Sequence, residues 1–263
     1  MNTRKYDALQ LRKSSTKEVS DVLMIEHPLS IGINGEAFTL TMQTPGDELD
    51  LARGILFTEG VYKNKIIHPE IDIVLTSEDG FISSLDVKVD SSLLDKSQLN
   101  KRNLLSVASC GICGKTELIL PAGESLSSPR SLQFEMIQDM FRQMAAGQNA
   151  FMASGGCHAA AIFNADRSIL VIKEDIGRHN AVDKVIGFLL NSEQLNHGTY
   201  LLVSGRVSYE IITKCFIAGI PFLMAVSAPS SLAVDFAKEL GITLIAFCRE
   251  DRATVYSHTE RIS

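Results

Sequence analysis

The chain has 263 residues, of which 45% are hydrophobic, and a formal net charge of -6 at pH 7. This length suits one large domain or two smaller ones, and the acidic balance argues against a general binder of nucleic acid or anionic membranes. The longest apolar run, Ile220 to Val226, is far too short to cross a bilayer. The polar start lacks the apolar core of a signal peptide. With five cysteines and no export signal, we expect a cytoplasmic protein with free or catalytic thiols.

The first part of the chain predicts a flexible terminus followed by a small α+β unit. Residues 1–25 are expected to form a flexible N-terminal segment. Residues 26–120 form the smaller unit, in which one hairpin turns at Asn34-Gly35 and a second at Asp79-Gly80. A helix is predicted between them over residues 47–59, because its apolar residues recur at helical spacing after a Thr-Pro-Gly start.

The second part, residues 131–263, predicts an α/β domain behind a boundary rich in Ser, Pro and Gly at residues 121–130. It opens with a helix over residues 132–147, whose stripe of Leu132 and three methionines indicates core packing, with a flexible binding groove as the alternative. Strands and helices then alternate, and apolar strands of this length between helices fit a largely parallel, covered sheet. The predicted strands are 158–163, 169–172, 199–203, 222–226 and 242–247, and the predicted helices are 180–190, 208–218 and 231–240.

Two thiols in the stretch Cys110-Gly111-Ile112-Cys113-Gly114 are the most informative feature of the sequence. Glycines flank them, the stretch reads as a loop, and nearby lysines and an arginine favour the thiolate form. Two cysteines this close can share a disulfide, hold half of a metal site or pass a sulfur atom between them. All three uses require a reactive thiolate. They stay open at this level, together with the structural alternative of two small buried residues beside a turn.

Polar segments follow four successive predicted strands. In open α/β sheets ligands bind at the carboxyl ends of strands, and the N–H groups at helix N-termini suit phosphate. If the strands are parallel, the four segments share one edge and predict a pocket for an anionic ligand, a nucleotide or a phosphorylated cofactor. Ordinary caps and surface ion pairs are the alternative. The residues concerned are Arg178, His179, Ser204, Gly205, Arg206, Ser208, Ser227, Ser230, Arg249 and Arg252.

His158 follows the pair Gly155-Gly156 and is placed near this pocket. Its neighbour Cys157 is expected to point to the opposite side of the strand. Zinc held by Cys110, Cys113 and His158 is a competing explanation for the thiol pair. Base deamination is disfavoured, because Ala160 occupies the position where such a zinc enzyme needs a glutamate. Cys215 is expected in the core, and Cys248 at the pocket.

Four motifs make the sequence resemble the FdhD family, the formate dehydrogenase accessory sulfurtransferases, from about Glu26 to Ile262. Cys157 departs from the family pattern, where Thr or Val is expected. The motifs are residues 109–115, Gly155-Gly156 with residues 158–161, residues 174–184 and residues 204–210.

The resemblance implies a homodimer with a cytidine-deaminase-like larger domain, a mixed, mostly parallel sheet and a smaller N-terminal part. It implies that Cys110 carries persulfide sulfur received from a cysteine desulfurase, with Cys113 as its partner. The client is the molybdenum or tungsten bis(molybdopterin guanine dinucleotide) cofactor of formate dehydrogenase, with GDP as a fragment ligand. The alternatives are a chaperone that only binds this cofactor, and a zinc- or dithiol-dependent enzyme. The family's cofactor-binding stretch falls on Phe247, Cys248, Arg249, Glu250, Asp251 and Arg252.

Overall fold

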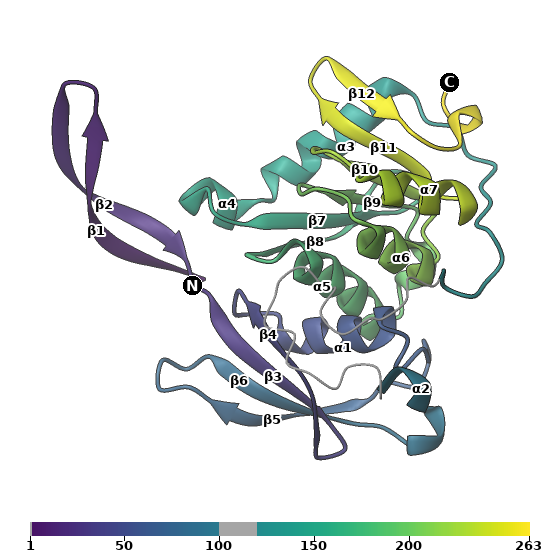
Figure 1. Cartoon of the computed structure of the whole chain (residues 1–263), viewed down its shortest axis with the longest axis horizontal. Coiled ribbons are helices and arrows are strands. Elements are labelled where there is room, and N and C mark those ends of the chain that lie inside the picture. The colour runs from purple at the N-terminus through teal and green to yellow at the C-terminus, as the bar shows by residue number, and fades with distance from the viewer. Residues whose placement is uncertain (1, 100–119) are drawn as a thin grey trace.

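The computed structural model of the protein describes residues 2–99 and 120–263, and these form three sheets (Figure 1). The first sheet is an antiparallel hairpin of β1 (Thr3–Arg12) and β2 (Ser15–Met24), which extends away from the rest of the chain. Residues 1–25 are expected from the sequence to form a flexible segment, and the sequence did not predict this hairpin. Its residues are mostly exposed on both faces, so no apolar alternation marks the strands. Whether the hairpin moves stays a prediction.

The second sheet and α1 (Glu48–Thr58) form the smaller N-terminal part. Asn34 and Gly35 both have positive φ, at 52° and 83°, which is the geometry of a tight two-residue hairpin turn. The apolar face of the sheet packs on α1 around Leu29, Ile31 and Leu56. A short α2 (Lys96–Leu99) follows this sheet. Its strands are β3 (His27–Ile33), β4 (Glu36–Gln43), β5 (Glu70–Thr76) and β6 (Ile82–Lys88), in the order β4-β3-β6-β5.

The third sheet is mixed, as the resemblance implied, but it is not mostly parallel. Only the pairs β9–β10 and β10–β11 are parallel, while the other three pairs are antiparallel. The reason is connectivity: short turns join β7 to β8 and β11 to β12, and parallel neighbours need a longer crossover. The strands are β7 (His158–Phe163), β8 (Ile169–Asp175), β9 (Tyr200–Val203), β10 (Phe222–Ala225), β11 (Thr243–Arg249) and β12 (Arg252–Val255), in the order β12-β11-β10-β9-β7-β8.

Helices cover both faces of this sheet (Figure 1). One face packs on three helices that follow strands, α5 (Arg178–Asn191), α6 (Tyr209–Ala218) and α7 (Ser231–Glu239). The other face packs on α3 (Phe134–Ala146), which is followed by α4 (Asn149–Ser154). Met140 and Met144 of α3 are buried there, which confirms that the methionine stripe is core. No described helix is both long enough and apolar enough to span a bilayer.

The N-terminal part is joined to the large sheet by a close crossing of α1 and α5 (Figure 1). A Cβ on Gly54 would lie 1.9 Å from the carbonyl oxygen of Asp183, and one on Gly187 would lie 1.8 Å from that of Asp50. Only glycine fits at these two positions, so the backbones of the helices touch. The two parts therefore pack closely against each other at this crossing.

Candidate functional site at the strand ends

The carboxyl ends of four strands meet at one edge of the large sheet, as the sequence predicted. β8 is antiparallel to β7, and β7 is antiparallel to β9, so β8 runs in the same direction as β9, β10 and β11. Backbone hydrogen bonds connect the loops that follow. The N–H of Ser204 donates to Ala159 at 3.0 Å, that of Val207 to Ala228 at 3.0 Å, and that of Phe247 to Ser227 at 3.3 Å.

Gly205 brings His158 and Arg178 together at this edge. A Cβ on Gly205 would lie 3.2 Å from Nδ1 of His158 and 3.3 Å from Cβ of Arg178, so the glycine keeps the three groups in close contact. Arg178 Nε is buried and has no hydrogen-bond partner among residues 2–99 and 120–263. Burial lowers the pKa of His158, and the charge of Arg178 lowers it further. Both effects favour the neutral form of the imidazole, which lies beside the positive charge of Arg178.

His179, Ser208 and Glu210 form a polar cluster beside this group. His179 Nε2 lies 3.3 Å from the Ser208 hydroxyl and 3.1 Å from Oε2 of Glu210, and the same hydroxyl donates to that oxygen at 3.2 Å. One imidazole nitrogen thus meets both partners, which differs from a relay through two nitrogens. The cluster orients the start of α6, and Arg206 just before it is exposed.

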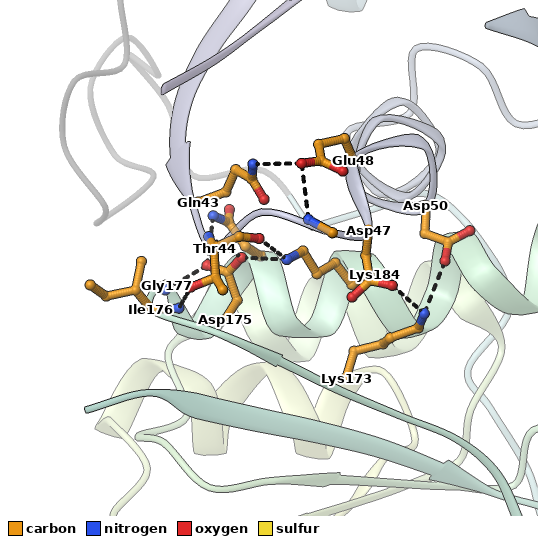
Figure 2. A network of polar contacts seen from close by, with 12 residues as sticks. Gln43, Thr44, Asp47, Glu48, Asp50, Lys173, Asp175, Ile176, Gly177 and Lys184 are labelled. Atoms are coloured by element: carbon orange, nitrogen blue, oxygen red, sulfur yellow. Dashed lines mark hydrogen bonds and ion pairs between the residues drawn. The ribbon is translucent and has the colours of Figure 1, made fainter. Parts of the chain in front are cut away.

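Asp175 anchors the loop that presents Arg178 and was missed by sequence reasoning (Figure 2). Its buried carboxylate accepts hydrogen bonds from the N–H of Gly177 at 2.7 Å and of Thr44 at 3.0 Å, and from the Asn180 amide at 3.1 Å. Lys184 pairs with it at 2.8 Å and donates to the carbonyl of Thr44 at 2.6 Å. The sequence alone could not predict this contact, because Thr44 lies 131 positions away from Asp175 in the chain.

A second polar contact between the N-terminal part and the large sheet is made by Lys173 of β8 (Figure 2). Lys173 contacts Asp47 at 2.5 Å and Asp50 at 3.2 Å, both on the segment that starts α1. Further along the interface, Lys214 of α6 pairs with Glu59 at 3.5 Å and donates to the hydroxyl of Thr58 at 2.8 Å. These ion pairs tie the small part to the sheet that carries the candidate site.

A cavity of about 510 Å³ opens on the α3 side of the same edge. Cys248, Arg249, Glu250 and Arg252 line it, so four residues of the predicted cofactor-binding stretch share one wall. Phe247 instead packs with the core on the opposite face, because its φ of 53° marks an irregularity in β11, and Asp251 is exposed at the turn. The opposite wall is α3, whose methionine stripe the sequence assigned to core packing in preference to a binding groove, and Met144 of that stripe lines the cavity. The sequence feature that could have indicated this wall is the pair of phenylalanines beside the methionine stripe, Phe134 and Phe141, which also line the cavity.

The predicted site residues therefore divide into two groups. His158, Arg178, His179, Ser204, Gly205, Arg206 and Ser208 belong to the α5 and α6 side of the edge, and none of them lines the cavity. Ser227 lies between the groups and holds Phe247 through its carbonyl oxygen. The sequence predicted that both groups lie at one edge of the sheet. It did not predict that one group lies on the α3 side and the other on the α5 and α6 side.

Three cysteines in the described part of the chain are free and buried: Cys157, Cys215 and Cys248. Burial raises the pKa of the Cys157 and Cys248 thiols to about 12, and it raises that of Cys215 strongly. Cys157 contacts Glu174 at 3.3 Å, away from His158, as its position in the strand predicted. Cys110 and Cys113 lie outside the described residues.

Metal binding by the described side chains alone has no support. Among residues 2–99 and 120–263, no three His, Cys, Asp or Glu side chains lie close enough to hold a metal ion. The competing zinc site needs Cys110 and Cys113, and so it lies outside the part of the chain that the structure describes.

Comparisons with known proteins place this architecture and its motifs in one family. The profile of the FdhD/NarQ family matches residues 24–263. A sulfur carrier protein FdhD from Mycolicibacterium paratuberculosis is 44% identical over 250 residues and 92% of each chain, and one from Saccharolobus solfataricus is 36% identical over 100% of this chain and 99% of its own. The crystal structure of a candidate formate dehydrogenase accessory protein from Desulfotalea psychrophila matches with a TM-score of 0.77 and 25% identity over the full length of both chains.

Proposed function

We propose a function from one premise: the chain belongs to the FdhD/NarQ family. Its relatives are sulfur carrier proteins, and the family is associated with an accessory role for formate dehydrogenase. This chain accepts sulfur from a cysteine desulfurase as a persulfide on Cys110. It passes that sulfur to the molybdenum or tungsten bis(molybdopterin guanine dinucleotide) cofactor, which is its substrate.

The chemistry of loading needs one thiolate. The thiolate of Cys110 attacks the terminal sulfur of the desulfurase persulfide, whose S–S bond breaks, and the desulfurase cysteine leaves as a thiolate. Cys110 then carries the persulfide. Delivery as sulfide requires two electrons, and Cys113 supplies them by attacking the inner sulfur of Cys110. This step forms a Cys110–Cys113 disulfide and releases sulfide, and a cellular dithiol must reduce the disulfide before the next cycle.

The observation that supports this assignment is the state of the other thiols. A persulfide carrier must be a thiolate at neutral pH and must be reachable by its donor. Cys157, Cys215 and Cys248 fail on both counts, because each is buried and burial raises each thiol pKa. In the sequence, the cations near the Cys110–Cys113 pair favour the thiolate, and the flanking glycines favour a loop that a donor can reach.

The strand edge supports a nucleotide-bearing client. Arg178 and Arg206 bring positive charge to the helix N-termini that follow β8 and β9, and Arg249 with Arg252 does so at the β11–β12 turn. A guanine dinucleotide carries a pyrophosphate, and arginine fork geometry suits its oxygens. GDP is therefore the fragment that we expect to bind at this edge.

The experiment is intact-protein and peptide mass spectrometry after incubation with a cysteine desulfurase and cysteine. The wild type and Cys215→Ala should each gain sulfur on Cys110, and Cys110→Ala should gain none. Cys113→Ala should load but fail to release sulfide. A wild-type chain that gains no sulfur would leave the chaperone role and the zinc- or dithiol-dependent enzyme, and sulfur found on Cys157 or Cys248 would move the carrier to that residue.

A further inference from the structure

The loop that follows α1, residues 60–69, exposes two adjacent isoleucines, and we call it the isoleucine loop. Ile66 is 83% exposed and Ile67 is 52% exposed, although isoleucine is among the residues most often buried. Single exposed apolar residues are common, but neighbouring ones that form a patch mark sites of protein interaction. The loop also contains two lysines and a histidine, and no acidic residue. It is therefore a basic and apolar stretch in a chain with a net charge of -6.

A buried scaffold braces the isoleucine loop from inside. The side chain of Arg53 on α1 is fully buried, and it donates to the carbonyl oxygens of Tyr62, at 3.4 Å, and Asn64. The Tyr62 hydroxyl donates to the carbonyl oxygen of Ile67 at 2.6 Å. The side chain of Asn64 accepts hydrogen bonds from the N–H groups of both isoleucines, at 2.9 and 2.8 Å. These contacts hold the two isoleucines in one arrangement before any partner binds.

The charge of Arg53 makes this scaffold costly to fold. Its guanidinium carbon lies 4.9 Å from the ring centroid of Tyr62, and burial lowers its pKa to about 10. Its Nε is buried and has no hydrogen-bond partner among residues 2–99 and 120–263. A buried cation is weak evidence for stability, so the arrangement is better explained by what the loop presents. A loop that is already held in its binding conformation loses less entropy when a partner docks.

A small cavity lies beside Ile66. Its volume is about 170 Å³, and its other apolar walls are Leu189 and Leu190 of α5 and Leu195 just after that helix. Pockets that bind small molecules have volumes of about 300–1,000 Å³. This cavity is too small for such a ligand, and it suits a single side chain of a protein. The size of the cavity and the exposure of the isoleucines therefore both indicate a protein partner.

The isoleucine loop lies next to the segment that leads towards the two thiols of the CxxC stretch. The N–H of Asp95 donates to the carbonyl oxygen of Val61 at 3.0 Å, so the residues just before α2 are attached to this loop. α2 ends at Leu99, which is 11 residues before Cys110 in the chain. A stretch of that length spans at most about 40 Å, even when it is fully extended. A protein docked on the loop is therefore close enough to meet Cys110.

We propose that the isoleucine loop and the cavity beside it form the docking surface for the cysteine desulfurase, an inference that rests on the proposed sulfur-carrier function. Ile66 and Ile67 enter an apolar pocket of the desulfurase, and an apolar side chain of the desulfurase fills the cavity between Ile66 and α5. Lys63, which is exposed, faces acidic residues at the rim of that pocket. Docking there brings the persulfide of the desulfurase to Cys110.

The test uses the desulfurase of the sulfur-loading experiment and measures its binding to the full chain by biolayer interferometry. Ile66→Asp and Ile67→Asp should each weaken binding at least about ten-fold, because each places a charge where the partner offers apolar surface. Sulfur loading of Cys110 should slow in both variants at low desulfurase concentration and recover when the desulfurase is saturating, because the thiol is unchanged. Leu11→Asp is the matched control: Leu11 is 72% exposed, and it lies on the hairpin that extends away from the rest of the chain (Figure 1). It should bind and load like the wild type.

The outcomes separate this inference from the proposed function. If the wild type is loaded and both aspartate variants bind the desulfurase as tightly as it does, the docking surface lies elsewhere and the inference is wrong, while the sulfur-carrier role stands. If the wild type gains no sulfur, the proposed function fails and the inference falls with it. Thermal unfolding shows whether each variant is folded. Should an aspartate variant fail to fold, Ile66→Ser and Ile67→Ser replace the pair, because serine removes the apolar surface without adding a charge.

Two other occupants of this surface would also overturn the inference. Analytical ultracentrifugation of Ile66→Asp tests a second copy of the chain: lost self-association with unchanged desulfurase binding would assign the surface to the homodimer. Binding of formate dehydrogenase apoprotein tests the acceptor side in the same way. Weaker binding of that protein alone would assign the surface to delivery of the cofactor, not to loading of sulfur.

Discussion

The thiol of Cys248 lies at the wall of the α3 cavity, and burial raises its pKa from 9.0 to about 12. Position at a site does not make it reactive, because only the thiolate is a nucleophile. At neutral pH its thiolate fraction is roughly a thousand-fold below that of an ordinary cysteine. Cys157 has the same raised pKa for the same first cause, and the carboxylate of Glu174 adds to it.

We predict that iodoacetamide at pH 8 leaves Cys157, Cys215 and Cys248 unlabelled in the native protein and labels them rapidly in urea. Peptide-resolved mass spectrometry gives the rate for each cysteine. Raising the pH should increase the rate at Cys248 about ten-fold per unit, because its pKa lies near 12. Native labelling of Cys248 as fast as in urea would show that the thiol is exposed and reopen its role as a sulfur carrier.

A second residue-scale prediction concerns His158. Its pKa in the folded protein lies below the ordinary 6.5, so the unfolded chain takes up this proton first as the pH falls. The contribution to stability is therefore complete above about pH 6.5 and declines as the pH drops towards the lower folded pKa. His158→Gln should remove this part of the acid dependence of the free energy of unfolding. Parallel pH profiles for the variant and the wild type would contradict it.

At the scale of elements, the crossing of α1 and α5 depends on two glycines. Gly54→Ala would place a methyl group 1.9 Å from the carbonyl oxygen of Asp183, so the helices must separate. We predict a loss of about 3 kcal/mol in the free energy of unfolding, which outweighs the gain of about 1 kcal/mol in helix propensity. Urea denaturation measures it.

Gly35→Ala is the control for this substitution. Gly35 has a left-handed backbone conformation, with φ of 83°, but a Cβ there would meet nothing within 4 Å. Its cost should be limited to backbone strain, about 1 kcal/mol. Equal losses in the two variants would mean that the helix crossing tolerates a methyl group.

Most individual elements could be predicted from the sequence, because each has a local cause. The Asn34-Gly35 turn and the apolar strand 158–163 are signals contained in a few residues. The hairpin β1–β2 could not be predicted, because neither face is covered and no alternation results. β12 was also missed: its pairing with β11 depends on an irregularity at Phe247, where φ turns positive. The direction of β7 depends on its neighbours, so a local pattern did not reveal the mixed sheet.

At the scale of the whole molecule, two buried lysines join the N-terminal part to the large sheet. Lys184 links the carbonyl of Thr44 to Asp175, at the start of the loop that carries Arg178. Lys214 links Thr58 to Asp183 on the α1 side of α5. Sequence reasoning found Arg178 from its motif, but it could not find Thr44 or Lys184 as its supports. These contacts bring together residues that are far apart in the chain.

The two lysines allow a matched comparison, which gives our last prediction. Lys184→Met and Lys214→Met each leave one buried carboxylate without its cation, and each should cost about 3–5 kcal/mol of stability. Only Lys184→Met should also speed hydrogen exchange over residues 176–180 and weaken GDP binding, because only Asp175 holds that loop in place. Asp175→Asn is a milder second variant, which keeps one acceptor for the N–H of Gly177. If Lys184→Met binds GDP as tightly as Lys214→Met does, the N-terminal part stabilises the fold without positioning the site.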